Sequence, residues 1–301
     1  MIFIHPGFGK TATTFLQEKV FHNQKNINSL GRPYYSSDRK NNLFFCEEIQ
    51  KNSCFYEPRV AQKLIKKIYK PKMVNILSDE VLGSSCYNNE NVILRIQKFF
   101  PNAKIFFTIR NQFDSIKSFY SNHGRMLKLS PMPYKGRFIK FNDWFDYEIK
   151  NLNLPNNYLG IIQYEPLIKL FEKYFGRKNI SILLYEEFIS NQDTFFRKLN
   201  RILDVNLGDI SKDKVKQRIS RSEYNYIKFR NKFLRGFPIS RIIPFSSFFK
   251  NKFFNLLESS NKYELKFNDQ QIKTLKSIYS KTNHKLSRNY KLNLSKWLYP
   301  M

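Results

Sequence analysis

Hydrophobic residues in the first 205 positions form short uninterrupted runs and longer stretches whose apolar residues lie three or four positions apart. Short runs bounded by turn residues predict buried strands, whereas the wider spacing predicts amphipathic helices. Strands are therefore expected at 1–5, 72–80, 102–110 and 179–188, and helices at 11–21, 58–69, 91–100, 113–123, 164–176 and 191–203. Strands that alternate with helices predict an α/β fold, in which helices flank a parallel central sheet.

Three of the predicted strands end in polar sequence: HPGFGKT after the first, SDE after the second and IRN after the third. The carboxyl ends of parallel strands share one edge of a sheet, and ligands of open α/β sheets bind at that edge. We therefore expect these three segments to meet there and to form the functional site.

The pattern changes from about residue 212, where basic and aromatic residues interleave and strand signals become rare. We interpret 206–301 as a mainly helical extension that packs as a lid over the ligand edge, within a single domain whose α/β core spans 1–205. Interleaved basic and aromatic residues are also typical of segments that contact a membrane surface or RNA, so peripheral membrane contact stays an alternative for this part.

Composition narrows the class of protein. Among 301 residues, 42% are hydrophobic and 17% aromatic, which excludes a disordered chain. The formal charge of +28 fits nucleic-acid or membrane binding, attraction of an anionic substrate or cofactor, or a lysine-rich solvated surface. The densest basic segment, KLIKKIYKPK, has the spacing of a solvated helix face. We assign most of the charge to the surface and the remainder to anion binding.

Cysteine usage and hydropathy indicate the compartment. Cys46, Cys54 and Cys86 are odd in number and form no CxxC pair, so neither a disulfide framework nor a zinc site is indicated. The chain shows no signal-peptide pattern and no apolar run of the length, about 18 residues, that a spanning helix needs. We expect a cytoplasmic protein with reduced thiols and no metal.

The sequence GFGKTATT, directly after the first strand, has the features of a phosphate-binding loop. Backbone N–H groups of such a turn point at one spot, and the dipole of the following helix adds positive potential. Lys10 adds a full charge, and the hydroxyls of Thr11, Thr13 and Thr14 are additional donors. The first Gly of the ATP-binding pattern G-x-x-x-x-G-K-[ST] would fall at Ile4, inside the strand, so this loop is tighter. A glycine turn with a solvated lysine is the alternative interpretation.

Two motifs resemble one family. HPGFGKTATTFLQ is similar to the 5′-phosphosulfate loop of sulfotransferases that use 3′-phosphoadenosine 5′-phosphosulfate (PAPS), in the version of bacterial carbohydrate sulfotransferases. In FFTIRNQFDSIKSFY, Arg110 ends a strand and Ser118 follows eight positions later, as in the pair that binds the 3′-phosphate in that family. Asp114 and Tyr120 also match, whereas Gln112 stands where proline is usual and puts the tightness of the turn in doubt. The resemblance covers about 1–205.

This resemblance implies the P-loop NTPase-like sulfotransferase fold and transfer of the sulfuryl group of PAPS to a carbohydrate hydroxyl, with PAP (3′-phosphoadenosine 5′-phosphate) as product and no metal. Lys10 would stabilise the charge that develops on the departing phosphate oxygen. Arg110 and Ser118 would bind and orient the 3′-phosphate, which ATP lacks. The implied nucleotide-binding residues are Gly7, Phe8, Gly9, Lys10, Thr11, Ala12, Thr13, Thr14, Arg110, Ser118 and, in a late loop, Arg218 with Ser222. For Arg218 and Ser222, a basic helix start with a serine cap is the alternative.

The acceptor hydroxyl needs a base, which in this family is a histidine or a carboxylate. We predict Glu80 for this role, with Asp79 as its orienting neighbour, because Glu80 ends a strand between the two motifs. A helix cap or an ion pair with Lys10 is the alternative role for Glu80. The other candidates for the base are Asp79 itself, His5, His123, Glu18, Glu47 and Glu48.

The acceptor itself is expected to be a glycan or glycolipid: an acidic polysaccharide, a lipopolysaccharide precursor or a lipid-linked sugar. The long aperiodic segment 120–144 is the predicted acceptor loop. Trp144, Tyr147 and Tyr134 are candidates for stacking on sugar rings or for core packing. No motif indicates an oligomeric state.

Two other functions compete with sulfuryl transfer. A small-molecule kinase of the P-loop class would need the first glycine of the ATP-binding pattern, which this sequence lacks. Such a kinase would also leave Arg110 and Ser118 unexplained. A nucleic-acid-binding protein would explain the charge of +28 but neither phosphate motif, so no nucleic-acid partner is expected.

Overall fold

The computed structural model describes residues 1–34, 39–84, 89–121, 134, 139–154, 156–208, 210 and 264–301. Its centre is a sheet of five parallel strands in the order β2-β3-β1-β4-β5. The strands are β1 (Ile2–His5), β2 (Ile27–Ser29), β3 (Val74–Ser78), β4 (Lys104–Ile109) and β5 (Ile180–Leu184). The predicted α/β fold with a parallel sheet is confirmed.

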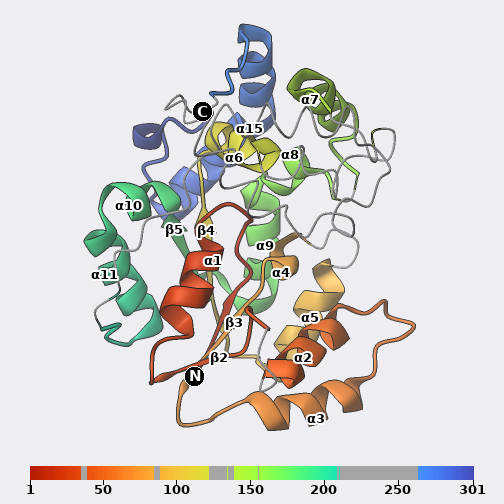
Figure 1. Cartoon of the computed structure of the whole chain (residues 1–301), viewed down its shortest axis with the longest axis vertical. Coiled ribbons are helices and arrows are strands. Elements are labelled where there is room, and N and C mark those ends of the chain that lie inside the picture. The colour runs from red at the N-terminus through yellow and green to blue at the C-terminus, as the bar shows by residue number, and fades with distance from the viewer. Residues whose placement is uncertain are drawn as a thin grey trace, which may run out of the picture.

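The helices cover both faces of this sheet (Figure 1). They are α1 (Thr13–Phe15), the π-helix η1 (Leu16–Phe21), α2 (Lys40–Gln50), α3 (Pro58–Ile68), α4 (Val81–Ser84), α5 (Asn89–Phe99), α6 (Gln112–Phe119), α7 (Phe141–Lys150), α8 (Tyr158–Ile161), α9 (Tyr164–Phe175), η5 (Arg177–Asn179), α10 (Tyr185–Ser190), α11 (Gln192–Leu203), α15 (Asp269–Tyr290) and η6 (Ser295–Trp297).

Alternating side chains of the strands form two hydrophobic cores. On one face Phe3 and Phe106 pack with η1, α10 and α11, to which Val20, Phe188 and Leu199 belong. On the other face the larger core joins the sheet to α2, α5, α9 and α15, with Ile4, Leu77, Phe107, Phe171 and Leu275 among its members. Because β1 and β4 are buried on both faces, their sequences read as continuous apolar runs.

Two predicted elements differ from the structure at their ends. The predicted strand at 179–188 ends at Leu184, and Tyr185–Ser190 form the helix α10. Glu186 and Glu187 occupy the first turn of that helix, where carboxylates are favoured by the helix dipole. The predicted helix at 11–21 begins only at Thr13 and continues as a π-helix, so Thr11 and Ala12 belong to the loop.

Some elements had no clear signal in the sequence. Strand β2 has three residues, two of them polar, which is too short for a periodicity argument.

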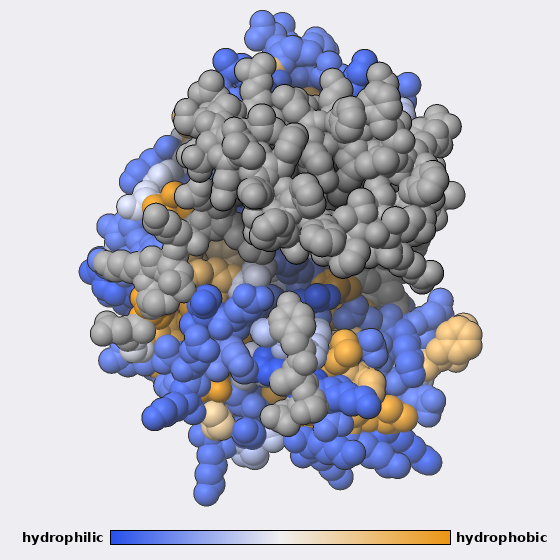
Figure 2. Space-filling model, in the orientation of Figure 1, coloured by the Kyte–Doolittle hydropathy of each residue, from blue (hydrophilic) through white to orange (hydrophobic). Residues whose placement is uncertain are grey.

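Of the predicted lid, 211–263 lie outside the described residues, whereas α15 is helical as expected and packs against α9. Where Figure 2 is coloured, the surface is mainly hydrophilic with scattered hydrophobic patches.

Candidate active site

The three polar strand ends lie together at the carboxyl edge of the sheet, as predicted. His5 is in register with Ser78, and the amide of Asp79 donates to the His5 carbonyl at 3.2 Å. From β4, the Arg110 guanidinium donates through Nη1 to the Lys10 carbonyl at 3.1 Å. Segments that are about 100 residues apart in sequence thus form one site.

The backbone of the loop after β1 repeatedly enters the left-handed region. Gly7, Lys10 and Ala12 have φ values of 56°, 73° and 65°. Positive φ is strained for Lys10 and Ala12, and such strain is characteristic of functional sites. Residues that place successive amides around left-handed positions form concave anion-binding sites. The loop therefore has the backbone of a phosphate site, although it lacks the first glycine of the ATP pattern.

Close contacts with other elements fix this loop. A β-carbon on Gly7 would lie 2.7 Å from Cγ2 of Thr13, and one on Gly83 in α4 would lie 2.3 Å from the Gly7 carbonyl oxygen. Only glycine permits both approaches, since real β-carbons do not come so near to other atoms. Helix α4 is therefore packed directly on the loop.

His5 supports the loop from below. Its Nδ1 lies 2.8 Å from the Ser78 hydroxyl and its Nε2 lies 3.1 Å from that of Thr108. Complete burial lowers the pKa of His5 to about 3, so the imidazole is neutral at physiological pH. With both ring nitrogens engaged and no solvent exposure, His5 is a structural residue rather than the acceptor base.

The side chains of the predicted loop residues have different environments. Phe8 is buried against Phe107 and Tyr164, so only its backbone is available to a ligand. The Thr11 hydroxyl is also buried; it donates to the Phe8 carbonyl at 2.6 Å and lies 2.8 Å from the Thr108 hydroxyl. Thr14 is exposed, so its hydroxyl is accessible to a ligand. The anion site therefore consists mainly of amides and Lys10, with fewer hydroxyls than expected.

Glu80 lies directly beside this loop. Its carboxylate accepts a hydrogen bond from the Thr13 hydroxyl, and a β-carbon on Gly9 would lie 3.9 Å from Oε2. Burial raises the pKa of Glu80, and the positive charges of Lys10 and Arg32 oppose this rise. The sequence left a helix cap or an ion pair with Lys10 as alternative roles for Glu80. The helix cap is Asp79 instead, because its Oδ1 accepts from the amide of Val81. Proximity to Lys10 is compatible with both an ion pair and a base.

Asp79 has partners other than Glu80. Its Oδ1 accepts from Nε of Arg32 at 3.0 Å, and its Oδ2 accepts from the Tyr34 hydroxyl at 2.8 Å. The carboxylate is 2% exposed and therefore unsuited to contact an acceptor directly. Its hydrogen bonds orient Arg32 and Tyr34 rather than Glu80.

Arg110 forms the second cationic centre. The guanidinium stacks on the Tyr185 ring at 4.4 Å from the centroid, and its Nε is buried with no hydrogen-bond partner among the residues that the structure describes. The backbone on both sides is fixed, since the Tyr164 hydroxyl donates to the Arg110 carbonyl at 2.7 Å and the amide of Asn111 donates to Glu186 at 2.7 Å. A buried donor without a partner costs free energy unless an anion accepts from it. Arg110 thus fits an anionic ligand.

The carboxyl end of the chain reaches this same centre. The side-chain amide of Asn111 donates to the carbonyls of Trp297 and Leu298 at 2.8 and 2.7 Å. The Tyr299 hydroxyl donates to Glu186 at 3.0 Å. Sequence reasoning missed Asn111, Glu186 and this tail, because their contacts span 75 to 187 residues and no local pattern indicates them.

Gln112 occupies the position where proline is usual in the motif that contains Arg110 and Ser118. Gln112 is fully buried and exchanges two hydrogen bonds with Asn283 of α15, at 2.9 and 3.2 Å. Asn111 caps α6 by accepting from the amide of Phe113. Gln112 therefore does not loosen the turn; it joins the turn to the carboxyl-terminal helix. Ser118 is half-buried on α6, and its hydroxyl has no hydrogen bond within the described residues.

The remaining candidate bases lie elsewhere or outside the described residues. Glu48 is buried on α2 and bonds to Lys51 and to the amide of Glu57, and Glu47 is exposed on the same helix. Glu18 is half-buried on η1. His123, Arg218 and Ser222 lie outside the described residues.

The three aromatic candidates for sugar stacking divide into two groups. Trp144 is 1% exposed and packs on Phe119, Tyr120 and Phe141, so the expectation that it stacks on a sugar is not met and core packing explains it. Tyr134 and Tyr147 are half-buried and contact each other edge to face.

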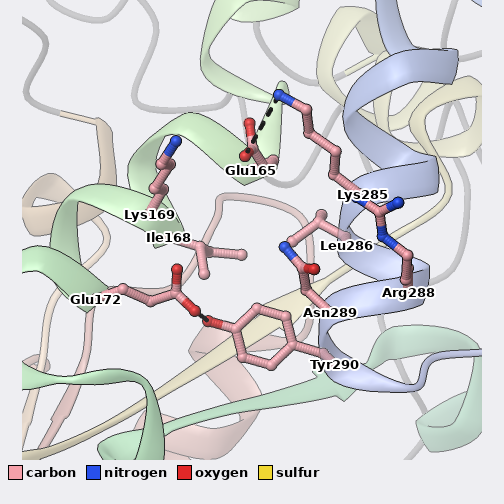
Figure 3. A pocket seen from close by; sticks show the side chains of 9 residues that line it. All are labelled: Glu165, Ile168, Lys169, Glu172, Lys285, Leu286, Arg288, Asn289 and Tyr290. Carbon is pink, nitrogen blue, oxygen red and sulfur yellow. Dashed lines mark hydrogen bonds and ion pairs between the residues drawn. The ribbon is translucent and has the colours of Figure 1, made fainter.

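A cleft away from this edge lies between α9 and α15 (Figure 3). Its charges are largely paired, since Lys285 lies 4.0 Å from Glu165 and the Tyr290 hydroxyl donates to Glu172 at 2.7 Å. No residue that lines the cleft was predicted for the site. Within the described ranges, no group of three or more His, Cys, Asp or Glu side chains is arranged to hold a metal ion. In the same ranges, none of the helices has the length and apolar character that crossing a bilayer demands.

Comparison with known proteins identifies the fold. No family model and no curated protein sequence matches the chain. Among solved structures, a sulfotransferase from Alicyclobacillus acidocaldarius matches with a TM-score of 0.59 and 14% identity, over 98% of this chain and 97% of that one. Mouse sulfotransferase SULT7A1, complexed with PAP, matches with a TM-score of 0.47 and 14% identity, over 96% and 87% of the two chains. The chain has the sulfotransferase fold, in agreement with the resemblance of its two motifs.

Proposed function

We propose that the protein transfers the sulfuryl group of PAPS to a hydroxyl of a glycan or glycolipid. One observation carries this proposal: the Arg110 guanidinium, whose buried Nε has no partner in the described ranges, bonds directly to the backbone of the loop at Lys10. Two anion-binding centres are thereby joined, as a nucleotide with both a 5′- and a 3′-phosphate requires. ATP, which lacks a 3′-phosphate, would leave Arg110 without a role, so the kinase alternative is not favoured.

In this function the loop residues act on the leaving group. Lys10 and the amides of 11–14 would stabilise the negative charge that develops on the bridging oxygen when its bond to sulfur breaks. Preorganised donors of this kind contribute about 3 kcal/mol each to transition-state stabilisation. The strained backbone at Lys10 and Ala12 keeps these donors in place before the reaction.

Glu80 is proposed as the base. As the new bond between the acceptor oxygen and sulfur forms, the hydroxyl proton would pass to the Glu80 carboxylate. Its raised pKa makes it a stronger base than an ordinary glutamate, and the nearby Lys10 and Arg32 favour its ionised form. Arg110 and Ser118 would bind the 3′-phosphate without taking part in bond making or breaking.

Calorimetric titration with PAP, ADP and ATP in the absence of magnesium tests the proposal. We expect tight binding of PAP and much weaker binding of ADP and ATP, because only PAP has the 3′-phosphate. A preference for ATP that appears only with magnesium would instead support the kinase.

A further inference from the structure

Arg32 stands at the same edge of the sheet as the proposed reaction centre, but on its outer side. The amide of Arg32 donates to the Ser78 carbonyl at 3.0 Å, which continues the pairing of β2 with β3 beyond Ser29. Arg32 therefore lies at the level of Asp79 and Glu80. No sequence pattern indicates a role for Arg32, because β2 is too short to be predicted.

Contacts at the Nε edge fix the orientation of the Arg32 guanidinium. Its Nε donates to Asp79, its Cζ lies 5.8 Å from the centre of the Tyr34 ring, and Tyr34 itself donates to the other oxygen of Asp79. The two terminal nitrogens make no hydrogen bond within the described part of the chain, and the side chain is 48% exposed. The donors best suited to a bidentate contact are therefore accessible.

Strand order indicates what these donors face. In the order β2-β3-β1-β4-β5, the proposed nucleotide site extends from the loop after β1 to Arg110 after β4. Glu80 follows β3, on the opposite side of β1, and Arg32 follows β2, one strand further out. An acceptor that reaches Glu80 from the side away from the nucleotide would therefore pass Arg32.

We propose that Arg32 binds an anionic group of the acceptor, so that the substrate is a sugar with a carboxylate or phosphate near the hydroxyl that receives sulfate. This proposal rests on the proposed function. A guanidinium presents parallel N–H donors that match carboxylate and phosphate oxygens, and Asp79 uses only the Nε edge. A second anion beside Glu80 would also need a neutralising charge, which Arg32 supplies.

Two matched acceptor pairs test the proposal with radiolabelled PAPS: chondroitin and carboxyl-reduced chondroitin, and phosphomannan and its phosphatase-treated form. We expect the wild-type protein to label at least one charged member about tenfold better than its neutral partner. The Arg32→Gln variant should lose this preference through a higher KM for the charged acceptor, while PAP affinity stays unchanged; its melting temperature should fall, because the buried Asp79 carboxylate loses its ion-pair partner. A charge-assisted pair of this type changes affinity by about 10- to 100-fold.

Two further variants separate acceptor binding from a structural role. Arg32→Lys keeps the charge beside Asp79 but loses the fork of donors, so an intermediate preference is expected even where Arg32→Gln folds poorly. Arg201→Gln makes the same chemical change on the exposed face of α11 and should behave as wild type.

The proposal is overturned by better labelling of the neutral members, by labelling of none of the four, or by an unchanged preference in Arg32→Gln and Arg32→Lys. Failure of the proposed function itself would be distinguishable, because the wild-type protein would then not bind PAP.

Discussion

The two proposed anion-binding centres of this protein are built in contrasting ways. The loop after β1 is formed by consecutive residues, with left-handed positions at Gly7, Lys10 and Ala12, and α4 packs directly on it. The centre at Arg110 is formed by distant segments: Tyr164 and Tyr185 contact the arginine, and the carboxyl-terminal tail bonds to Asn111 beside it.

This contrast bears on what each centre does. A loop of consecutive residues that neighbouring elements hold in place is preorganised for the reacting group, where donors must not move as charge develops. A centre assembled from tertiary contacts is suited to binding a group that does not react. Substitutions in the first centre should therefore affect turnover, and substitutions in the second should affect nucleotide affinity and stability.

Removal of the Lys10 charge should have the largest effect on activity. Lys10→Ala is expected to lower kcat by about 1,000-fold, because the developing charge loses its cationic partner. Single-turnover transfer from radiolabelled PAPS measures this directly. Lys19→Ala, on the exposed side of η1, is the control and should retain activity. Near-normal turnover in Lys10→Ala would remove Lys10 from the mechanism.

Glu80→Gln tests the base, with an expected loss of about 100-fold in kcat. The glutamine oxygen can still accept from Thr13, so folding and PAP binding should stay normal. Because burial raises the pKa of Glu80 and the ionised form is the active one, wild-type kcat should rise with pH through a pKa above the usual 4.5.

The variant should lose this acidic limb of the pH profile. Glu47→Gln, on the exposed surface of α2, should keep it. An acidic limb that persists in Glu80→Gln would assign the base to another residue. Loss of folding in the variant would instead indicate that Glu80 is an ion-pair partner of Lys10.

Arg110→Ala tests the second centre. We expect PAP affinity to fall by about 10- to 100-fold while ADP affinity changes little, because a charge-assisted contact to the 3′-phosphate is lost. Titration calorimetry with both nucleotides gives the ratio, and Arg201→Ala is the matched control. An unchanged preference for PAP over ADP would show that another residue recognises the 3′-phosphate.

The same contrast explains what could be predicted from the sequence. The loop, the strands that flank it and the position of Glu80 follow from local patterns, and the structure contains them. The partners of Asn111, beside Arg110, could not be predicted, because Glu186 lies in a segment predicted as strand and Trp297 is nearly 190 residues away. The roles of the Phe8 and Trp144 side chains stayed open for another reason: burial of an aromatic side chain depends on tertiary packing, which spacing alone does not reveal.

The link between Gln112 and Asn283 tests how far the second centre depends on the carboxyl-terminal helix. Gln112→Leu and Asn283→Leu should each destabilise the fold by about 1–3 kcal/mol, because each leaves a buried amide without its partner. The double variant should lose less stability than the sum of the two, since it removes both amides together. Urea denaturation measures all three.

Nucleotide affinity should respond more weakly than stability in these variants. Asn111 still bonds to Trp297 and Leu298 after either substitution, so the backbone at Arg110 retains its second anchor. We therefore expect PAP affinity to fall by only a few-fold, well below the effect of Arg110→Ala. A loss as large as that of Arg110→Ala, in a variant that remains folded, would show that the amide pair itself positions the arginine. Strict additivity of the two stability losses would instead show that Gln112 and Asn283 act independently, and that the tail alone joins the centre to the end of the chain.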